Sequence, residues 1–234
     1  MKTKEAVRSI VDALKALYPD GICSLNYEKD YELLFSVRLA AQCTDERVNK
    51  VTPALYARFP TLEDLAGADV AEVERYIHST GFFRAKARDI VLASQMLLRD
   101  YGGKVPGTME ELLKLPGVGR KTANLMLGDV FHVPGVVVAD THCIRISNRL
   151  GLCDTKDPYK VEQQLKKLLP PEESNSFCHR LVLFGRDVCS ARSPRCGACP
   201  LQDVCPSRVS LAPSPGGGGS APSPAKKKRS GTAE

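Results

Sequence analysis

The stretch Leu115–Arg149 constrains the fold more than any other part of the chain. It opens with LPGVG, which cannot continue a helix because proline lacks an amide donor and glycine favours other backbone conformations. A short amphipathic segment precedes it from Thr108, and KTANLMLGDVF follows with the composition of a helix. The sequence therefore predicts two helices joined by a tight hairpin. Gly117 and Gly119 both allow a positive φ and leave backbone N–H groups free to bind an anion such as phosphate.

Two ionisable residues in this stretch have the chemistry of a catalytic pair. Lys121 lies where the second helix begins, where the helix dipole and neighbouring Arg120 disfavour another positive charge. A free amine is a nucleophile that can form a Schiff base. Asp140 follows the apolar run 136–139 and is predicted to cap a third helix that is closed by Gly151. The alternatives are a solvated lysine and a purely structural cap.

Four of the nine cysteines form the pattern Cys189-x6-Cys196-x2-Cys199-x5-Cys205. Four thiolates at this spacing can hold a zinc ion or an iron–sulfur cluster, and spacing alone leaves both open. Paired disulfides fit poorly with a chain that shows no signal peptide. The remaining cysteines are scattered among apolar residues and are predicted to be small core side chains: Cys23, Cys43, Cys143, Cys153 and Cys178.

Helical patterns fill most of the remaining chain up to residue 188, and only the run 136–139 alternates with the period of a strand. The predicted helices cover 1–18, 31–41, 46–59, 62–68, 70–80, 84–101, 158–170 and 171–188. The predicted helix caps are Thr44 or Asp45, Thr61 and Asp69. In the last helix the predicted core residues are Phe177, Leu181, Val182 and Phe184. The fold class is therefore predicted to be all-α.

Composition limits the protein class more than the function. The 234 residues, 43% of them hydrophobic, can bury one large core or two smaller ones. No run of eighteen apolar residues exists, so no membrane span is expected. The first 17 residues carry charges throughout and lack the apolar core of a signal peptide, which predicts an intracellular, cytoplasmic protein. The net charge of +6 is compatible with a polyanionic partner.

Residues 209–234 differ from the rest of the chain in composition. They are rich in Pro, Gly and Ser with few apolar residues, and are expected to be disordered. Residues 226–229 are consecutively basic and supply half of the net charge once Glu234 is subtracted. Such a run can contact about four phosphates without reading sequence. An inert tail is the alternative.

The segments LPGVGRKTAN and VADTH, with the cysteine spacing, resemble the endonuclease III family of helix-hairpin-helix DNA glycosylases. The resemblance runs from the N-terminus to about Cys205. It implies that the four patterned cysteines hold a [4Fe–4S] cluster. It also implies two helical domains with a substrate cleft between them: a helix-hairpin-helix barrel domain at 22–134, and a cluster domain assembled from 1–21 and 135–208.

The resemblance implies a bifunctional DNA glycosylase and AP lyase of base excision repair. Such an enzyme would act as a monomer on double-stranded DNA with damaged bases or abasic sites, and would be nucleoid-associated in a bacterium. Lys121 would attack the sugar and Asp140 would assist from the opposite wall. A monofunctional glycosylase of the adenine-mismatch type is an alternative, although it usually lacks this lysine. A non-catalytic damage-binding module and a redox-sensing iron–sulfur protein are the others.

Family positions also imply contacts with DNA. Gln42 matches the glutamine that fills the gap left by a flipped nucleotide, and Phe82 falls where the family places an apolar wedge. The phenylalanine departs from the commoner aliphatic residue. An exposed glutamine, a core phenylalanine and a histidine satisfied by the backbone are the alternatives. The other expected DNA-binding residues are Leu115, Gly117, Val118, Gly119, Arg120, Thr122 and His142.

Overall fold

The computed structural model describes residues 2–208, and this part of the chain is helical and contains no β-strand. The all-α class is confirmed. Its α-helices are α1 (Lys4–Leu17), α2 (Asp30–Leu39), α3 (Asp45–Arg58), α4 (Leu62–Ala66), α5 (Val70–Ile77), α6 (Phe83–Tyr101), α7 (Met109–Leu112), α8 (Arg120–Asp129), α9 (Thr141–Arg149), α10 (Pro158–Leu168) and α11 (Ser174–Asp187). Its 3-10 helices are η1 (His78–Thr80), η2 (Pro171–Glu173) and η3 (Cys196–Ala198).

None of these helices is both long and apolar enough to cross a bilayer, within the residues that the structure describes. The expectations for the tail at 209–234 fall outside those residues.

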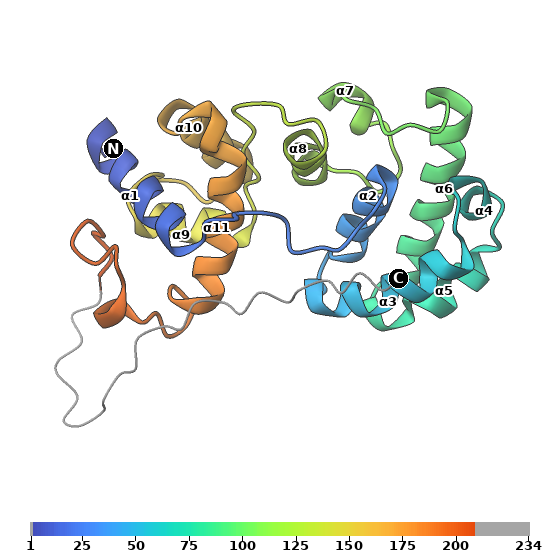
Figure 1. The fold of residues 1–234 in the computed structure, drawn as a ribbon, viewed down its shortest axis with the longest axis horizontal. Helices are drawn as coiled ribbons and strands as arrows, with labels where there is room; N and C mark the ends of the chain where they lie inside the picture. The colour runs from blue at the N-terminus through green and yellow to red at the C-terminus, as the bar shows by residue number, and fades with distance from the viewer. Residues whose placement is uncertain (1, 209–234) are drawn as a thin grey trace, which may run out of the picture.

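The helices form two groups on either side of α8 (Figure 1). We call α2–α8 the hairpin lobe, and α1, α9–α11 and η3 the cysteine lobe. Helix α8 contacts α2 and α7 of its own lobe and α11 of the other, so it lies at the junction. Helix α1 packs against α11, and the cysteine lobe is therefore assembled from both ends of the described chain.

Side-chain caps begin several helices where the sequence predicts them. Thr61 and Asp69 accept backbone N–H groups in the first turns of α4 and α5. Thr44 caps α3 by accepting from Arg47, which leaves the carboxylate of Asp45 free for other contacts. Gly102 ends α6 in the left-handed conformation, with a φ of 59°.

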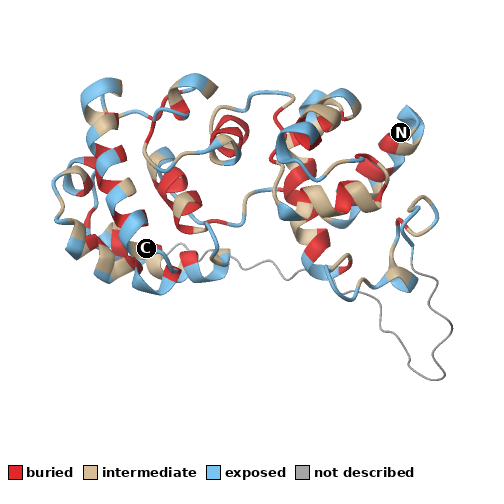
Figure 2. Ribbon diagram, turned by 180° about the vertical axis from the view of Figure 1, so that it is seen from behind, coloured by how far each residue is buried: buried red, intermediate tan, exposed pale blue. Residues whose placement is uncertain are grey.

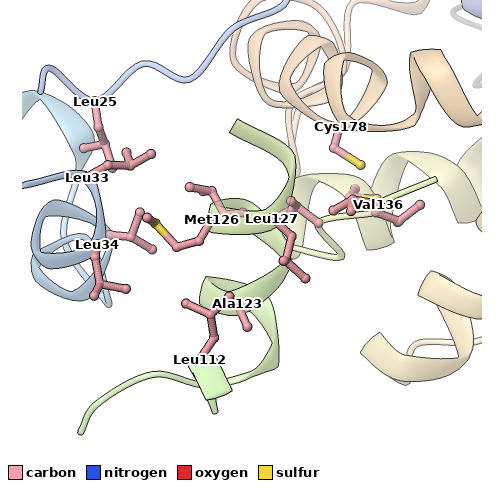
Figure 3. Packing of buried hydrophobic residues seen from close by; sticks show 14 of the residues in the cluster. Leu25, Leu33, Leu34, Leu112, Ala123, Met126, Leu127, Val136 and Cys178 are labelled. Carbon is pink, nitrogen blue, oxygen red and sulfur yellow. The ribbon is translucent and has the colours of Figure 1, made fainter. Parts of the chain in front are cut away.

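Both lobes and α8 contain buried residues (Figure 2), and the buried apolar side chains form one cluster. In the hairpin lobe, α4 and α5 pack along α6. Ala123 and Met126 of α8 are fully buried, and Met126 points toward the leucines of α2 (Figure 3). One core prediction is wrong: Val182 is only half-buried and lines the cleft described below, because α11 turns this face away from the core. The other predicted core residues of α11 are buried: Phe177, Leu181 and Phe184.

Candidate active site and cysteine centre

The hairpin before α8 is shaped by one glycine rather than two. Gly117 has a φ of 73°, a left-handed conformation that favours glycine. A Cβ there would lie 2.7 Å from both Arg38 Nε and Asp89 Oδ2, which form an ion pair beneath the turn. Gly119, by contrast, has a φ of −102° and open space around it, so it does not use the positive φ that glycine allows. Gly119 instead begins α8 without a side-chain cap, which leaves the first N–H groups of the helix uncovered.

Lys121 is the second residue of α8 and is exposed. Among the described residues its amine makes no hydrogen bond or ion pair. Arg120 does not crowd it as the sequence suggested, because the Arg120 guanidinium donates to both carboxylate oxygens of Glu162 at 2.7 and 2.8 Å. That guanidinium also lies over the ring of Tyr159, 4.7 Å from its centroid. The positive charge of Arg120 is thus paired within the protein.

Asp140 is the N-cap of α9, as predicted. Its Oδ1 accepts the backbone N–H of Cys143 at 2.7 Å, which fixes the orientation of the carboxyl group. The buried run 136–138 leads into this cap and anchors it against the core. Only one carboxylate oxygen is used by the cap, so the second remains available to a substrate.

A cleft of about 540 Å³ separates the two lobes. Lys121 lines it from α8, Asp140 and His142 from the start of α9, and Gln42 from the turn between α2 and α3. Helix α11 contributes the wall that includes Val182. The structure thus brings four predicted site residues, which span 100 positions of the sequence from Gln42 to His142, to one cavity. Phe82 does not line it.

His142 is half-buried in this cleft. Its Nδ1 lies 3.3 Å from Nη2 of Arg145, and because a guanidinium only donates, Nδ1 is the acceptor. Burial lowers the pKa of His142, although Asp140 opposes the shift. The neutral ring therefore carries its proton on Nε2, which is left to donate to another group. Gly185 makes room for the ring, since a Cβ there would lie 2.3 Å from Nδ1.

Sequence reasoning missed a polar group in the cleft formed by Asp45, Ser24 and Arg186. The Asp45 carboxylate accepts from the Ser24 hydroxyl and, at 2.8 Å, from the Arg186 guanidinium. Burial raises the pKa of Asp45, but these hydrogen bonds and the positive charges of Arg186 and Lys121 outweigh it and hold the pKa below its usual range. The site thus keeps a second carboxylate charged near Lys121.

Two turns outside this network carry the predicted gap-filling residues. Gln42 has a φ of 56° and Phe82 a φ of 49°, and both are exposed non-glycine residues in the left-handed region. Phe82 is 68% exposed, which excludes the alternative of a core phenylalanine. A large apolar side chain so exposed on a strained backbone is typical of a contact with another molecule.

The four patterned cysteines surround a second cavity, of about 200 Å³, in the cysteine lobe. Arg149, at the end of α9, donates to Cys189 Sγ at 3.3 Å and to the Ser190 carbonyl at 2.7 Å. Arg145 donates to the Cys189 carbonyl at 3.1 Å. Helix α9 therefore begins at the cleft and ends at the cysteine loop.

Three similarities identify the family of the chain. Residues 35–171 match a family model described as HhH-GPD superfamily base excision DNA repair protein. Residues 189–205 match the iron–sulfur binding domain of endonuclease III. Endonuclease III of Synechocystis sp. is 48% identical over 204 residues, which are 87% of this chain and 93% of that protein. The chain belongs to the endonuclease III family.

Other endonuclease III proteins agree. That of Bacillus subtilis is 42% identical over 88% of this chain and 94% of its own length. A solved structure titled as a trapped endonuclease III–DNA covalent intermediate is 43% identical, with a TM-score of 0.83, and the match covers 88% of this chain and 97% of that one. Membership of the endonuclease III family makes the chain a base excision repair glycosylase/lyase with a [4Fe–4S] cluster.

The cysteine cavity is compatible with such a cluster. Among the described residues, no group of three or more His, Cys, Asp or Glu side chains converges closely enough to bind one metal ion. The same four cysteines nevertheless line one cavity of about 200 Å³, which has room for a larger inorganic group. The match to the iron–sulfur binding domain of endonuclease III decides for iron over the zinc ion that spacing had left open.

The predicted DNA-binding residues of the hairpin lie in different surroundings. Leu115 is 2% exposed, so its side chain belongs to the core and only its backbone is available to DNA. The Arg120 side chain is held by Glu162 rather than left free for phosphate. Gly117 and Gly119 are exposed, as the hairpin prediction requires, while Val118 and Thr122 are half-buried.

The scattered cysteines also divide into two groups. Cys143, Cys153 and Cys178 are buried core residues, as predicted, and Cys178 also lines the cleft. Cys23 and Cys43 are only half-buried and line the cleft as well. Burial raises the pKa of Cys23 to about 12, so this thiol stays protonated and unreactive at neutral pH.

Proposed function

We propose that this chain removes oxidised pyrimidines from duplex DNA and then cuts the strand at the abasic site, with Lys121 as the nucleophile. The observation that carries the proposal is the exposed, unpaired Lys121 amine facing the same cleft as the capped Asp140. A relative has been captured as a covalent intermediate with DNA, which supports a covalent route here. Both walls of the cleft come from one chain, so a monomer suffices.

The chemistry follows from these two groups. The Lys121 amine gives its electron pair to C1′ of the flipped nucleotide, and the glycosidic bond breaks with its electron pair leaving on the base. Asp140 stabilises the positive charge that develops on the sugar and takes the proton released by the amine. The sugar ring then opens to a Schiff base. That imine acidifies the C2′ proton, and its loss expels the 3′ phosphate by β-elimination.

We assign the remaining predicted residues by the same reasoning. Gln42 and Phe82 enter the duplex from their exposed turns when the damaged nucleotide leaves the stack. The uncovered N–H groups at the start of α8 bind a backbone phosphate, and the Nε2 proton of His142 is placed to bind the sugar–phosphate backbone. The domain boundary near residue 134 places the hairpin in one domain, while 1–21 and 135–208 form the other.

The cluster has a structural part in this proposal. Cys189, Cys196, Cys199 and Cys205 would hold it, and no step of bond breaking passes through it. When bound, the cluster ties together a loop that carries little core of its own. The protein thus works on DNA inside the cell with its chemistry confined to the cleft.

Borohydride trapping tests the assignment directly. Reduction of the Schiff base joins the enzyme irreversibly to a duplex that carries one oxidised pyrimidine. The native chain should become covalently attached, whereas Lys121→Gln should bind the duplex without attachment, base removal or strand cutting, a loss above about 10⁴-fold. Lys114→Gln, a nearby lysine change with the same loss of charge, serves as the matched control. Strand cutting by Lys121→Gln at near-native rate would sink the proposal, and base removal without attachment by the native chain would indicate the monofunctional alternative.

A further inference from the structure

Lys86, in the first turns of α6, is an unusual core residue. Its side chain is completely buried, with 0% exposure. Lysine is almost never fully buried unless its ammonium group has partners, because transfer of a charge out of water is costly. Here Nζ donates to two backbone carbonyls, those of Leu39 and Thr80, each at 2.8 Å.

The two carbonyls belong to separate turns. Leu39 is the last residue of α2 and precedes Gln42 by three positions. Thr80 is the last residue of η1 and precedes Phe82 by two. A single nitrogen atom therefore joins the bases of the two turns that carry Gln42 and Phe82.

The backbone conformation of both turns requires stabilising contacts. Gln42 and Phe82 both have left-handed φ angles, which cost about 1 kcal/mol or more each and persist only where the surroundings enforce them. Within the described chain, no other hydrogen bond joins residues 39–43 to residues 78–83. The Thr80 hydroxyl bonds to Ile77, inside its own turn.

The link does not depend on the charge of the amine. Burial lowers the pKa of Lys86, but a neutral amine still carries two N–H groups, one for each carbonyl. An apolar side chain of the same length would fill the space and leave both carbonyls without this donor.

We propose that Lys86 is a positioning residue that fixes the Gln42 and Phe82 turns relative to each other, so that both side chains enter the duplex at a set separation. The inference rests on the proposed function of Gln42 and Phe82. It predicts a selective requirement. Lys86 matters when a nucleotide must leave a duplex and its gap must be filled, and it does not matter for the lysine chemistry on a strand that has no partner.

The experiment compares two substrates under single-turnover conditions. One is a duplex with a single abasic site, and the other is the same strand without its complement. Lys86→Met, which keeps the length of the side chain, should slow cleavage of the duplex by about 10²-fold while cleavage of the single strand stays within about twofold of the native rate. Ser94→Ala is the matched control, because Ser94 is also fully buried on α6 but bonds only to Ile90 of its own helix.

Epistasis supplies the second measurement. In a chain that already carries Gln42→Ala and Phe82→Ala, Lys86→Met should cause no further loss on the duplex. An equal loss on both substrates, or a further loss in the double variant, would overturn the positioning role. If the Gln42→Ala, Phe82→Ala variant with native Lys86 cleaves the duplex at the native rate, the proposed gap-filling function of the two turns is contradicted. That result is distinct from any result for Lys86.

The inference can be tested even if Lys86→Met does not fold. In that case the cleavage rates of the duplex and the single strand are compared for Lys86→Gln, whose shorter amide side chain can reach one carbonyl. It should show a smaller but still duplex-selective loss. A Lys86→Gln chain that cleaves both substrates at native rates would contradict the inference.

Discussion

The hairpin at 115–119 precedes α8, and the cysteine loop at 189–205 follows α11. Both helices line the cleft, but the two segments are stabilised in different ways. The hairpin has Leu115 in the core beneath it and the Arg38–Asp89 ion pair against Gly117. In the cysteine loop Leu201 is the one fully buried residue, and the four cysteines are only half-buried around a cavity. The hairpin therefore takes its shape from packing, whereas the loop depends on the group that its cysteines bind.

The difference predicts how variants destabilise each region. A region held by packing loses stability gradually, because a changed side chain removes some contacts and leaves others. A loop organised by a cluster loses most of its structure in one step when the cluster is lost. Variants in the two regions should therefore differ in kind as well as in size.

The largest effect is expected at the cysteine loop. The purified chain should be brown with about four irons. Cys199→Ser should remove the colour and most of the soluble yield before any effect on chemistry can be measured. Cys153→Ser, at a buried cysteine away from the loop, is the control and should retain iron. Iron content, visible absorption and yield are the measurements. One zinc ion in a colourless native protein would contradict the assignment.

Asp140→Asn should give the next largest effect, and it tests the helix that joins the two regions. An amide caps a helix as well as a carboxylate does, so the melting temperature should stay close to that of the native chain. The loss of the charge should slow base removal by roughly 10²-fold or more. Single-turnover rates and a thermal melt decide the matter. A collapse in melting temperature with little change in rate would make Asp140 a structural residue.

Gly117→Ala tests whether the hairpin is held by packing. The added Cβ meets Arg38 and Asp89 at 2.7 Å on a left-handed backbone, so the free energy of unfolding should fall by about 1–3 kcal/mol. Gly119→Ala is the matched control, because its Cβ would meet no atom within 4 Å. Urea unfolding should separate the two variants, with the iron content unchanged in both. Equal free energies of unfolding for Gly117→Ala and Gly119→Ala would contradict the role of the ion pair beneath the turn.

The smallest effect is expected at the junction between the lobes, and it depends on pH. Burial raises the pKa of Glu162, but hydrogen bonds from Arg120 and Lys166 outweigh it and lower the folded pKa. The stabilisation is therefore fully present above the ordinary pKa of about 4.3 and is lost as the pH falls through the folded value. Glu162→Gln should be less stable at pH 7, by about 1 kcal/mol, and this deficit should disappear in acid. Thermal melts from pH 7 to pH 3 test this, and a constant difference between the two chains would contradict it.

Local patterns in the sequence predicted much of the site. Lys121 and Asp140 were found because each lies at the start of a helix whose boundaries the sequence marks with glycine or a cap. Asp45 and Arg186, 141 residues apart, could not be paired, because nothing local relates the turn after α2 to the end of α11. Lys86 was missed for the same reason, since its partners are backbone carbonyls that any sequence would supply.

The order of the chain in the cysteine lobe has a consequence for synthesis on the ribosome. Helix α1 packs against α11, and Arg180 of α11 donates to the Tyr18 carbonyl that ends α1. At about 5–20 residues per second, α1 leaves the ribosome many seconds before α11 exists. The hairpin lobe, whose helices are contiguous, can form in that interval, while the apolar face of α1 stays uncovered. The cysteine lobe is therefore the last to close, and chaperones have their longest access to α1.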